Sequence, residues 1–225
     1  MKKTLIAFLL MTFALTEVSA KMNQTGYRWR NDDGNETAAT WKAPEGQYIN
    51  LNGIETIRLR IQANNLFSEN DSFNEDISLY YSSGTFGSPW QKITTNPGNA
   101  FVLFNSPHLS DLTPTSRQLN AQAETFQPGV FFESTSDHGV TMPYGFYSEY
   151  EWAIRPSESA GPDIYYFALG HGEEDAPIIT VAQEEDAARL NFDPNPASVP
   201  LKKWSVYASL LMLTGFILIR YRKLL

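Results

Sequence analysis

The feature that most constrains the fold is a two-residue alternation of apolar and polar side chains. Residues 55–62 read ETIRLRIQ, and residues 148–155 read SEYEWAIR. Successive side chains of an extended strand point to opposite faces, so each segment has one apolar face and one polar face. The alternation predicts two half-buried β-strands. Their outer faces, which include Glu149 and Glu151, are expected to lie in water.

Three further segments favour extended structure because they are rich in β-branched and aromatic residues. They are residues 76–82, 163–169 and 177–182. Gly, Pro and Asn turns separate these segments, and no long stretch has the period of a helix. The pattern predicts an all-β fold, an antiparallel β-sandwich of the jelly-roll or Ig-like kind.

Long loops and a spacer complete the expected folded domain, which spans residues 21–190. Residues 64–75 and 106–122 have no strand pattern, and the second segment has room for a short helical turn. Phe67 and Phe73 are expected to fold back onto the core. Residues 191–203 include three prolines and are predicted to form an extended spacer.

The N-terminus has the three parts of a secretory signal. Two lysines precede an apolar run over residues 4–16, and Val18 and Ala20 precede the expected cleavage site. Residues 1–20 are therefore predicted to be a signal peptide, with Lys21 as the first mature residue. The expected partners of this segment are the secretory translocon and signal peptidase. The chain has no cysteine, so disulfides cannot stabilise the exported domain.

The C-terminus has a second apolar run, over residues 204–219. A helix of this length spans roughly 24 Å, and Trp204 and flanking lysines can extend its reach towards the roughly 30 Å of a bilayer core. The run predicts one transmembrane helix, with the basic end at residues 220–225 in the cytoplasm. Two interpretations stay open. The helix is either a permanent anchor in the membrane or an address that a processing enzyme cuts.

Charge separates the predicted domain from its tail. Residues 21–200 hold ten Lys or Arg against twenty-four Asp or Glu, which leaves a net charge of −14. A domain this acidic repels phosphate backbones, so nucleic acid is not an expected partner.

The acidic turn at residues 31–36 is a candidate calcium site. Its oxygen donors are Asp32, Asp33, Asn35 and Glu36, and calcium binds six to eight oxygens. The spacing does not match the loop of a helix-loop-helix calcium site, so a hydrogen-bonded turn is the alternative. No other cofactor is expected.

No residue pattern predicts a catalytic site, and the chain is not expected to be an enzyme. His138 follows Asp137 in a turn, but the sharp G-x-S-x-G turn of many serine hydrolases is absent. Glu149 and Glu151 are the best pair for glycoside hydrolysis, although strand alternation alone accounts for them. Among the aromatic residues, Trp90 in a loop is the best candidate for stacking against a sugar.

Two segments resemble known groups of proteins. Residues 27–41, YRWRNDDGNETAATW, resemble a motif near the mature N-terminus of uncharacterised bacterial surface proteins. The tail is similar to sorting signals of the PEP-CTERM class, in the variants with Val-Pro or Ile-Pro and a tryptophan at the helix start. The residues that carry this second resemblance are Val199, Pro200, Leu201, Trp204, Arg220, Arg222 and Lys223.

The second resemblance implies processing by an exosortase, a membrane cysteine transpeptidase, and transfer to the envelope or its polysaccharide. The tail departs from the pattern of this class in two ways. Pro-Glu-Pro is absent, and Lys202 and Lys203 follow the motif. The sequence thus predicts an exported, envelope-anchored bacterial protein with a non-enzymatic binding or structural domain outside the cytoplasm. The alternative is a carbohydrate-binding or small glycan-active module anchored permanently by its helix.

Overall fold

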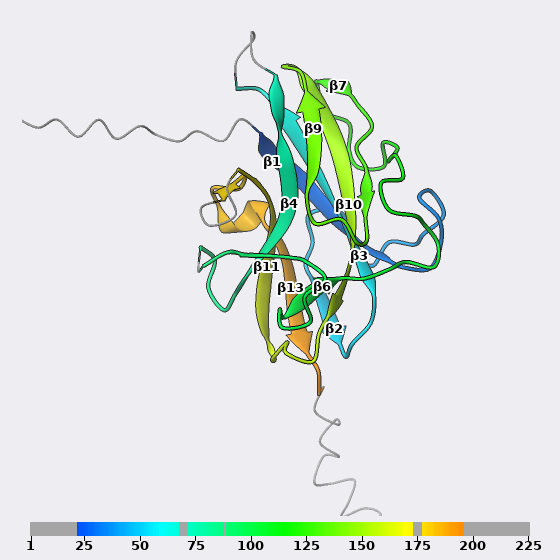
Figure 1. The fold of residues 1–225 in the computed structure, drawn as a ribbon, viewed down its shortest axis with the longest axis vertical. Coiled ribbons are helices and arrows are strands. Elements are labelled where there is room, and N and C mark those ends of the chain that lie inside the picture. Colours follow the sequence, from blue (N-terminus) through cyan, green and yellow to red (C-terminus); the bar gives the residue numbers. More distant parts are fainter. Residues whose placement is uncertain (1–21, 68–71, 88, 173–176, 196–225) are drawn as a thin grey trace, which may run out of the picture.

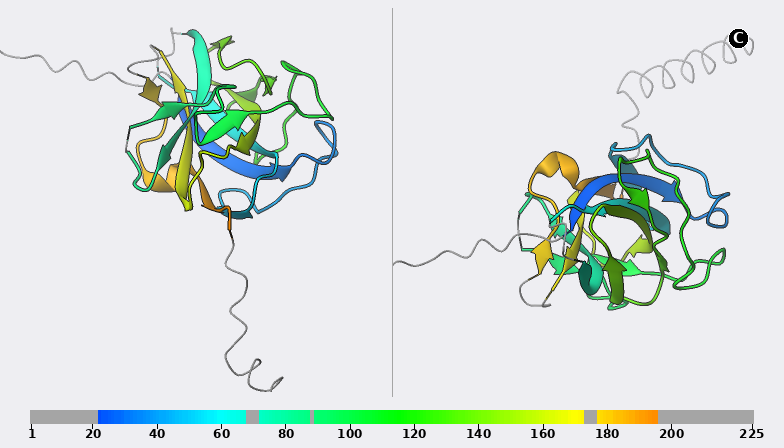
Figure 2. Two further views of the ribbon diagram at one scale, coloured as in Figure 1. Left: turned by 60° about the horizontal axis from the view of Figure 1, so that its bottom comes forward. Right: turned by 90° about the horizontal axis from the view of Figure 1, so that it is seen from above.

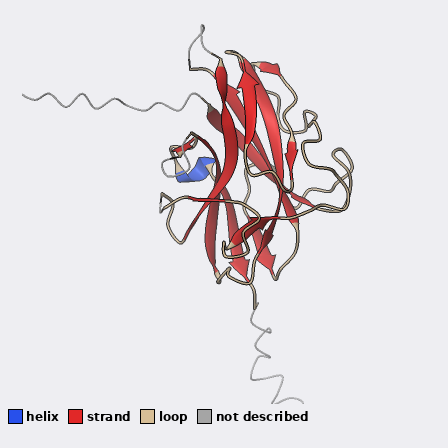
Figure 3. Ribbon diagram, viewed as in Figure 1, coloured by secondary structure: helices blue, strands red, loops and turns tan. Residues whose placement is uncertain are grey.

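The structure is a computed structural model that describes residues 22–67, 72–87, 89–172 and 177–195 (Figure 1). Its regular elements are β-strands, apart from one 3-10 turn at Glu184–Asp186 (Figure 3). Within these ranges, no helix is long and apolar enough to cross a bilayer. Both predicted targeting segments, including the cleavage residues Val18 and Ala20 and the sorting residues from Val199 to Lys223, lie outside the described residues.

The described strands form two mainly antiparallel sheets, an arrangement consistent with a β-sandwich. The six-stranded sheet contains β1 (Asn23–Asn31), β3 (Ile57–Asn65), β6 (Phe101–Leu103), β7 (Thr125–Phe126), β8 (Phe131–Phe132) and β10 (Phe146–Pro156). The seven-stranded sheet contains β2 (Ile49–Asn52), β4 (Phe73–Ser83), β5 (Gln91–Lys92), β9 (His138–Met142), β11 (Asp163–His171), β12 (Ile178–Ile179) and β13 (Ala188–Asp193).

Strands that are far apart in sequence pair at the centre of each sheet. In the six-stranded sheet, β3 lies between β1 and β10, and both pairings are antiparallel. In the seven-stranded sheet, β11 lies between β4 and β13. The chain passes repeatedly from one sheet to the other, and two of these crossings lie between β3 and β4 and between β10 and β11. Figure 2 shows β1, in blue, and β13, in orange, in separate layers.

The apolar faces of the two sheets meet in one hydrophobic core, as the alternation predicts. Phe101 is a fully buried member of this core, with its ring edge-on to Tyr165 at 4.8 Å and to Phe167 at 4.9 Å between centroids. Trp152 stacks on Phe132 with a centroid distance of 4.9 Å. Such ring pairs add to the stabilisation from burying apolar area.

Four of the five predicted strands correspond to long strands, namely β3, β4, β10 and β11. The fifth segment, 177–182, forms only the two-residue strand β12. Phe73 begins β4 and is fully buried, whereas Phe67 is 45% exposed and does not join the core. Residues 191–193 were assigned to the spacer but continue β13, where they pair with β2.

Two expectations about the outside of the six-stranded sheet are wrong. Residues 106–122 form a loop without the suggested helical turn. The outer faces of β3 and β10 are not in water, because Glu149 and Glu151 have no exposed area and all nine residues of β3 are buried. The loop from residue 106 to 122 and the segment 32–41 lie over this face, and we call them the covering loops.

Candidate functional site

The outer face of the six-stranded sheet holds the largest charged cluster in the described part of the molecule. Strand register brings the charges together, because Arg30 on β1 pairs with Arg58 on β3, and Arg60 pairs with Glu151 on β10. Three arginines would repel one another in this position without carboxylates nearby. Four carboxylates surround them: Asp32, Glu36, Glu149 and Glu151.

Glu151 is the shared partner of the three arginines. Its Oε2 accepts from Nε of Arg60 at 2.6 Å and from Nη1 of Arg30 at 3.1 Å. Its Oε1 accepts from Nη1 of Arg58 at 3.5 Å. All four side chains are fully buried. Charges so far from water need partners on nearly every polar atom, and Glu151 supplies one to each arginine.

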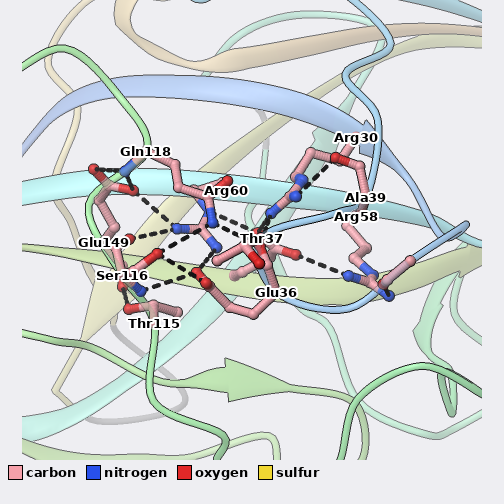
Figure 4. A network of polar contacts seen from close by, with 12 residues as sticks. Arg30, Glu36, Thr37, Ala39, Arg58, Arg60, Thr115, Ser116, Gln118 and Glu149 are labelled. Carbon is pink, nitrogen blue, oxygen red and sulfur yellow. Dashed lines mark hydrogen bonds and ion pairs between the residues drawn. The ribbon is translucent and has the colours of Figure 1, made fainter.

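Arg60 has the most carboxylate partners of the three arginines. Besides Glu151, it donates to Glu149 at 3.0 Å and to Glu36 at 2.6 Å (Figure 4). Burial alone lowers the pKa of Arg60, but the three carboxylates outweigh it and the net pKa is raised. Arg30 has one carboxylate and two backbone carbonyl acceptors, and its pKa is lowered, chiefly by burial.

The longer covering loop is held by hydrogen bonds from its own backbone. The N–H groups of Gln118 and Leu119 donate to the Glu149 carboxylate at 2.9–3.1 Å. Gln62 donates to the carbonyl of Asn120 at 2.9 Å. The segment that contains Gly129 passes very close to β10. A Cβ on Gly129 would lie 2.2 Å from the carbonyl oxygen of Glu149, so only glycine fits there.

The acidic turn proposed for calcium supplies the shorter covering loop. Asp32 accepts from Arg58 at 2.5 and 2.7 Å, and Glu36 accepts from Arg60 and Ser116. Asp33 accepts from Thr40, and Asn35 accepts from the N–H groups of residues 37 and 38. No group of three or more His, Cys, Asp or Glu is arranged to hold a metal ion in the described ranges. Calcium binding stays a prediction.

The same geometry gives a physical account of the motif at residues 27–41. Tyr27 and Trp29 point into the core, while Arg28 and Arg30 point outward. The two guanidinium groups lie over the ring of Trp41, at 4.3 and 4.5 Å from its centroid. The motif ends in an isolated antiparallel bridge between Arg30 and Trp41.

The histidines do not form a hydrolase-like site in the part of the chain that is described. His171 Nδ1 lies 2.6 Å from Glu75. Asp137 bonds to Lys92 and to Ser78, not to the adjacent His138. No imidazole there is hydrogen-bonded to a serine hydroxyl. The carboxylate pair Glu149 and Glu151 has no exposed area, and both side chains are hydrogen-bonded to Arg60.

The exposed aromatic residues offer a different kind of site. Trp90, the predicted sugar-stacking residue, is half-buried and packs edge-on against Phe86 at 5.8 Å. Tyr48 is 49% exposed and forms a wall of two shallow depressions. Sequence reasoning missed Tyr48, because it directly precedes the half-buried strand β2 and no local pattern distinguishes it from a core residue.

Two sequence comparisons give no relative from which a function could be transferred. No protein-family model matches the chain, and a search of curated proteins finds no significant match. A function for this protein therefore has to be argued from its own residues.

Proposed function

We propose that the protein is exported and held in the bacterial envelope, with a sandwich that binds a ligand or forms part of the outer layer. The observation that carries this proposal is the order of segments in the sequence: a signal-like N-terminus, a folded domain, a proline-rich segment, and a short apolar run with a basic end. The folded domain extends at least to Asp193, where β13 ends beside β2.

We further propose a jelly-roll rather than an Ig-like topology, with one transmembrane helix at residues 204–219. The support for the jelly-roll is that two connections between the sheets, β3 to β4 and β10 to β11, join strands that pair with each other. The consecutive strands β3 and β4 lie in opposite sheets and pair with β10 and β11, which also lie in opposite sheets. Such paired crossings wind a ribbon of two strands around the sandwich.

A non-catalytic role is supported by what the carboxylates do. The pair that best suits glycoside hydrolysis is enclosed, and arginines and backbone N–H groups take up its oxygen atoms. A hydrolase needs one such group open to a glycosidic bond and to water. The second candidate function is a carbohydrate-binding module on a permanent anchor, which the exposed Tyr48 favours.

Cell fractionation and intact-mass measurement of the mature protein test the proposal. The matched strains are one with an exosortase-type transpeptidase and one from which that enzyme has been deleted. We expect Lys21 as the first residue in both strains, and no residues after about Pro200 in the strain that has the enzyme. In the deletion strain we expect an intact tail in the membrane fraction.

The Pro200→Ala variant is the matched control within the chain, and it should keep its tail in both strains. An intact tail in every strain, still in the membrane, would favour the permanent anchor. Freely soluble protein that retains Leu225 would overturn membrane attachment altogether.

A further inference from the structure

We propose that the surface around Tyr48 binds a neutral carbohydrate chain, with sugar units on both sides of the tyrosine ring. We call this surface the Tyr48 platform. On one side it is lined by Lys42, Ala43, Ile49 and Asn50, and on the other by Tyr27, Gly46, Glu184, Glu185, Ala187 and Arg189. The inference deepens the proposed binding role of the exported domain and rests on it.

The fold holds the backbone of Tyr48 in place while leaving about half of the residue exposed. The next residue, Ile49, is buried and pairs with Leu190 of β13, so the backbone at the start of β2 is fixed. The Tyr48 side chain is nevertheless 49% exposed, more than any other large apolar side chain in the described residues. Exposed aromatic faces with fixed backbones suit the apolar faces of sugar rings.

Arg189 supplies hydrogen-bond donors next to the ring. The parallel register of β2 and β13 places it beside Tyr48, and its guanidinium lies over that ring at 5.2 Å from the centroid. Its side chain forms no hydrogen bond or ion pair within the described part of the chain, and its Nε is buried without a partner. A partly buried guanidinium with free donors is the group that a ligand hydroxyl would satisfy.

Acceptors and further polar groups surround this pair. Glu184 and Glu185 are exposed, and Glu184 is positioned by the hydroxyl of Tyr166 at 2.8 Å. Across the ring, Asn50 is held by Asn191 at 2.9 Å. The two depressions measure about 350 and 310 Å³ and share Tyr48 as a wall. Tyr48 therefore stands between two separate polar surfaces, as the central ring of a site for an extended ligand would.

The mixture of charges decides the class of ligand. A sugar hydroxyl both donates and accepts, so it can use Arg189 and Glu185 at once. A polyanion would meet the two glutamates in a domain that is already acidic, and an apolar ligand would leave the charged groups without partners. A neutral glycan fits both signs. Because the depressions are shallow, we expect a weak site with a dissociation constant of micromolar to millimolar size.

Affinity electrophoresis of the full-length chain in a mild detergent tests the platform. The probes are dextran, hydroxyethyl cellulose, galactomannan and the polyanion alginate. We expect at least one neutral polysaccharide to retard the protein, with little change on adding salt. Tyr48→Ala should weaken that association at least tenfold, and Arg189→Met should weaken it by a smaller factor.

Two control substitutions lie outside the platform. Tyr144→Ala removes a tyrosine that is 36% exposed. Phe104→Ala removes a second exposed ring that lies under an arginine. The Arg155 guanidinium lies 4.7 Å from the centroid of this ring, and both residues line a different depression. Both variants should bind like the unchanged protein. Unchanged melting temperatures would show that loss of binding in Tyr48→Ala is not loss of folding.

The inference is overturned if no neutral polysaccharide retards the protein, if Tyr48→Ala binds normally, or if only alginate binds and salt abolishes it. Loss of binding in Phe104→Ala, with Tyr48→Ala normal, would move the site elsewhere and also overturn it. Fractionation reports separately on the proposed function. A protein that stays in the membrane but binds no neutral polysaccharide contradicts this inference alone. A soluble protein that binds a neutral polysaccharide contradicts only the membrane anchoring.

Discussion

At its central strands β3 and β10, the six-stranded sheet has two faces that are equally buried but chemically opposite. On the inner face, Trp152 and Ile154 of β10 pack against the rings of the hydrophobic core. On the outer face of the same strand, Glu149 and Glu151 lie among arginines beneath the covering loops. All four side chains have at most 1% of their area exposed.

The difference teaches that equal burial has two physical origins in this molecule. Apolar area stabilises the inner layer in proportion to the surface removed from water, with no requirement on direction. The outer layer loses hydration energy on burial, and directed bonds must offset that loss. Its bonds therefore fix where the covering loops lie, because each carboxylate and guanidinium accepts only certain geometries.

The largest effect is expected for Glu151→Gln. The change keeps the shape of the side chain but removes the charge shared by Arg30, Arg58 and Arg60. Uncompensated buried charge should lower the free energy of unfolding by about 3–5 kcal/mol, measured by urea denaturation. The exposed Glu158→Gln is the control and should change little. A loss as small as the control's would mean that the two faces do not differ as described.

Acid should weaken the outer layer before the inner one. Burial alone raises the pKa of Glu36, but hydrogen bonds from Ser116 and Arg60 outweigh it, so the pKa lies below its ordinary value. In the same way, bonds from Thr135 and its neighbours overcome burial and lower the pKa of Asp111. A lowered folded-state pKa contributes stability that is present above the unfolded value and is lost as the pH falls through the folded value.

We therefore expect the unfolding free energy to fall progressively below about pH 4, near the ordinary pKa of these carboxyl groups. Because several carboxylates contribute, the unfolding free energy lost to acid should exceed the unfolding free energy lost when one buried methylene group is deleted from the core. Thermal unfolding between pH 7 and pH 2 measures it, and Glu36→Gln should flatten the acid-dependent part. A stability that is constant down to pH 2 would contradict the proposed role of the network.

A smaller effect is expected for Ile154→Val in the inner layer. Deleting one buried methylene should lower the unfolding free energy by about 0.5–1.5 kcal/mol. Because no charge is involved, the difference from the unchanged protein should be the same at pH 7 and pH 4. If the difference depended strongly on pH, the two layers would be coupled rather than separate.

The smallest effect is expected for Glu55→Gln, which breaks an ion pair at the surface. Lys42 donates to Glu55 at 2.7 Å, and the glutamate side chain is 53% exposed. Water and salt screen such a pair, so the loss should be about 0–1 kcal/mol and should vanish at high salt. A loss near that of Glu151→Gln would show that burial does not set the strength of these ion pairs.

The fold class follows from local patterns, while the second buried layer does not. The alternation in residues 55–62 and 148–155 predicts β3 and β10 and the side of each that enters the core. The same pattern predicts that Glu149 lies in water, because nothing nearby in sequence indicates a cover. The cover comes from Gln118 and Leu119, about thirty residues earlier, and from the turn at Glu36.

The candidate binding surface illustrates the same limit. Trp90 stands in a loop-like context and is an obvious candidate from sequence, yet Phe86 half-covers it. Tyr48 and Arg189 meet only because β2 and β13 pair in parallel, a contact between residues 141 positions apart in sequence. No periodicity or motif predicts that meeting.

The sequence by itself determined that this chain forms strands and which strand faces are apolar. It also predicts targeting segments on either side of the folded domain. Those properties depend on side-chain order within a few residues, through the two-residue period of a strand and the length of an apolar run. Only the tertiary structure decided that the charged faces of β3 and β10 are buried and that Tyr48 stays exposed. Both outcomes depend on which distant segment covers a surface, because burial is a property of the packed chain and not of its local order.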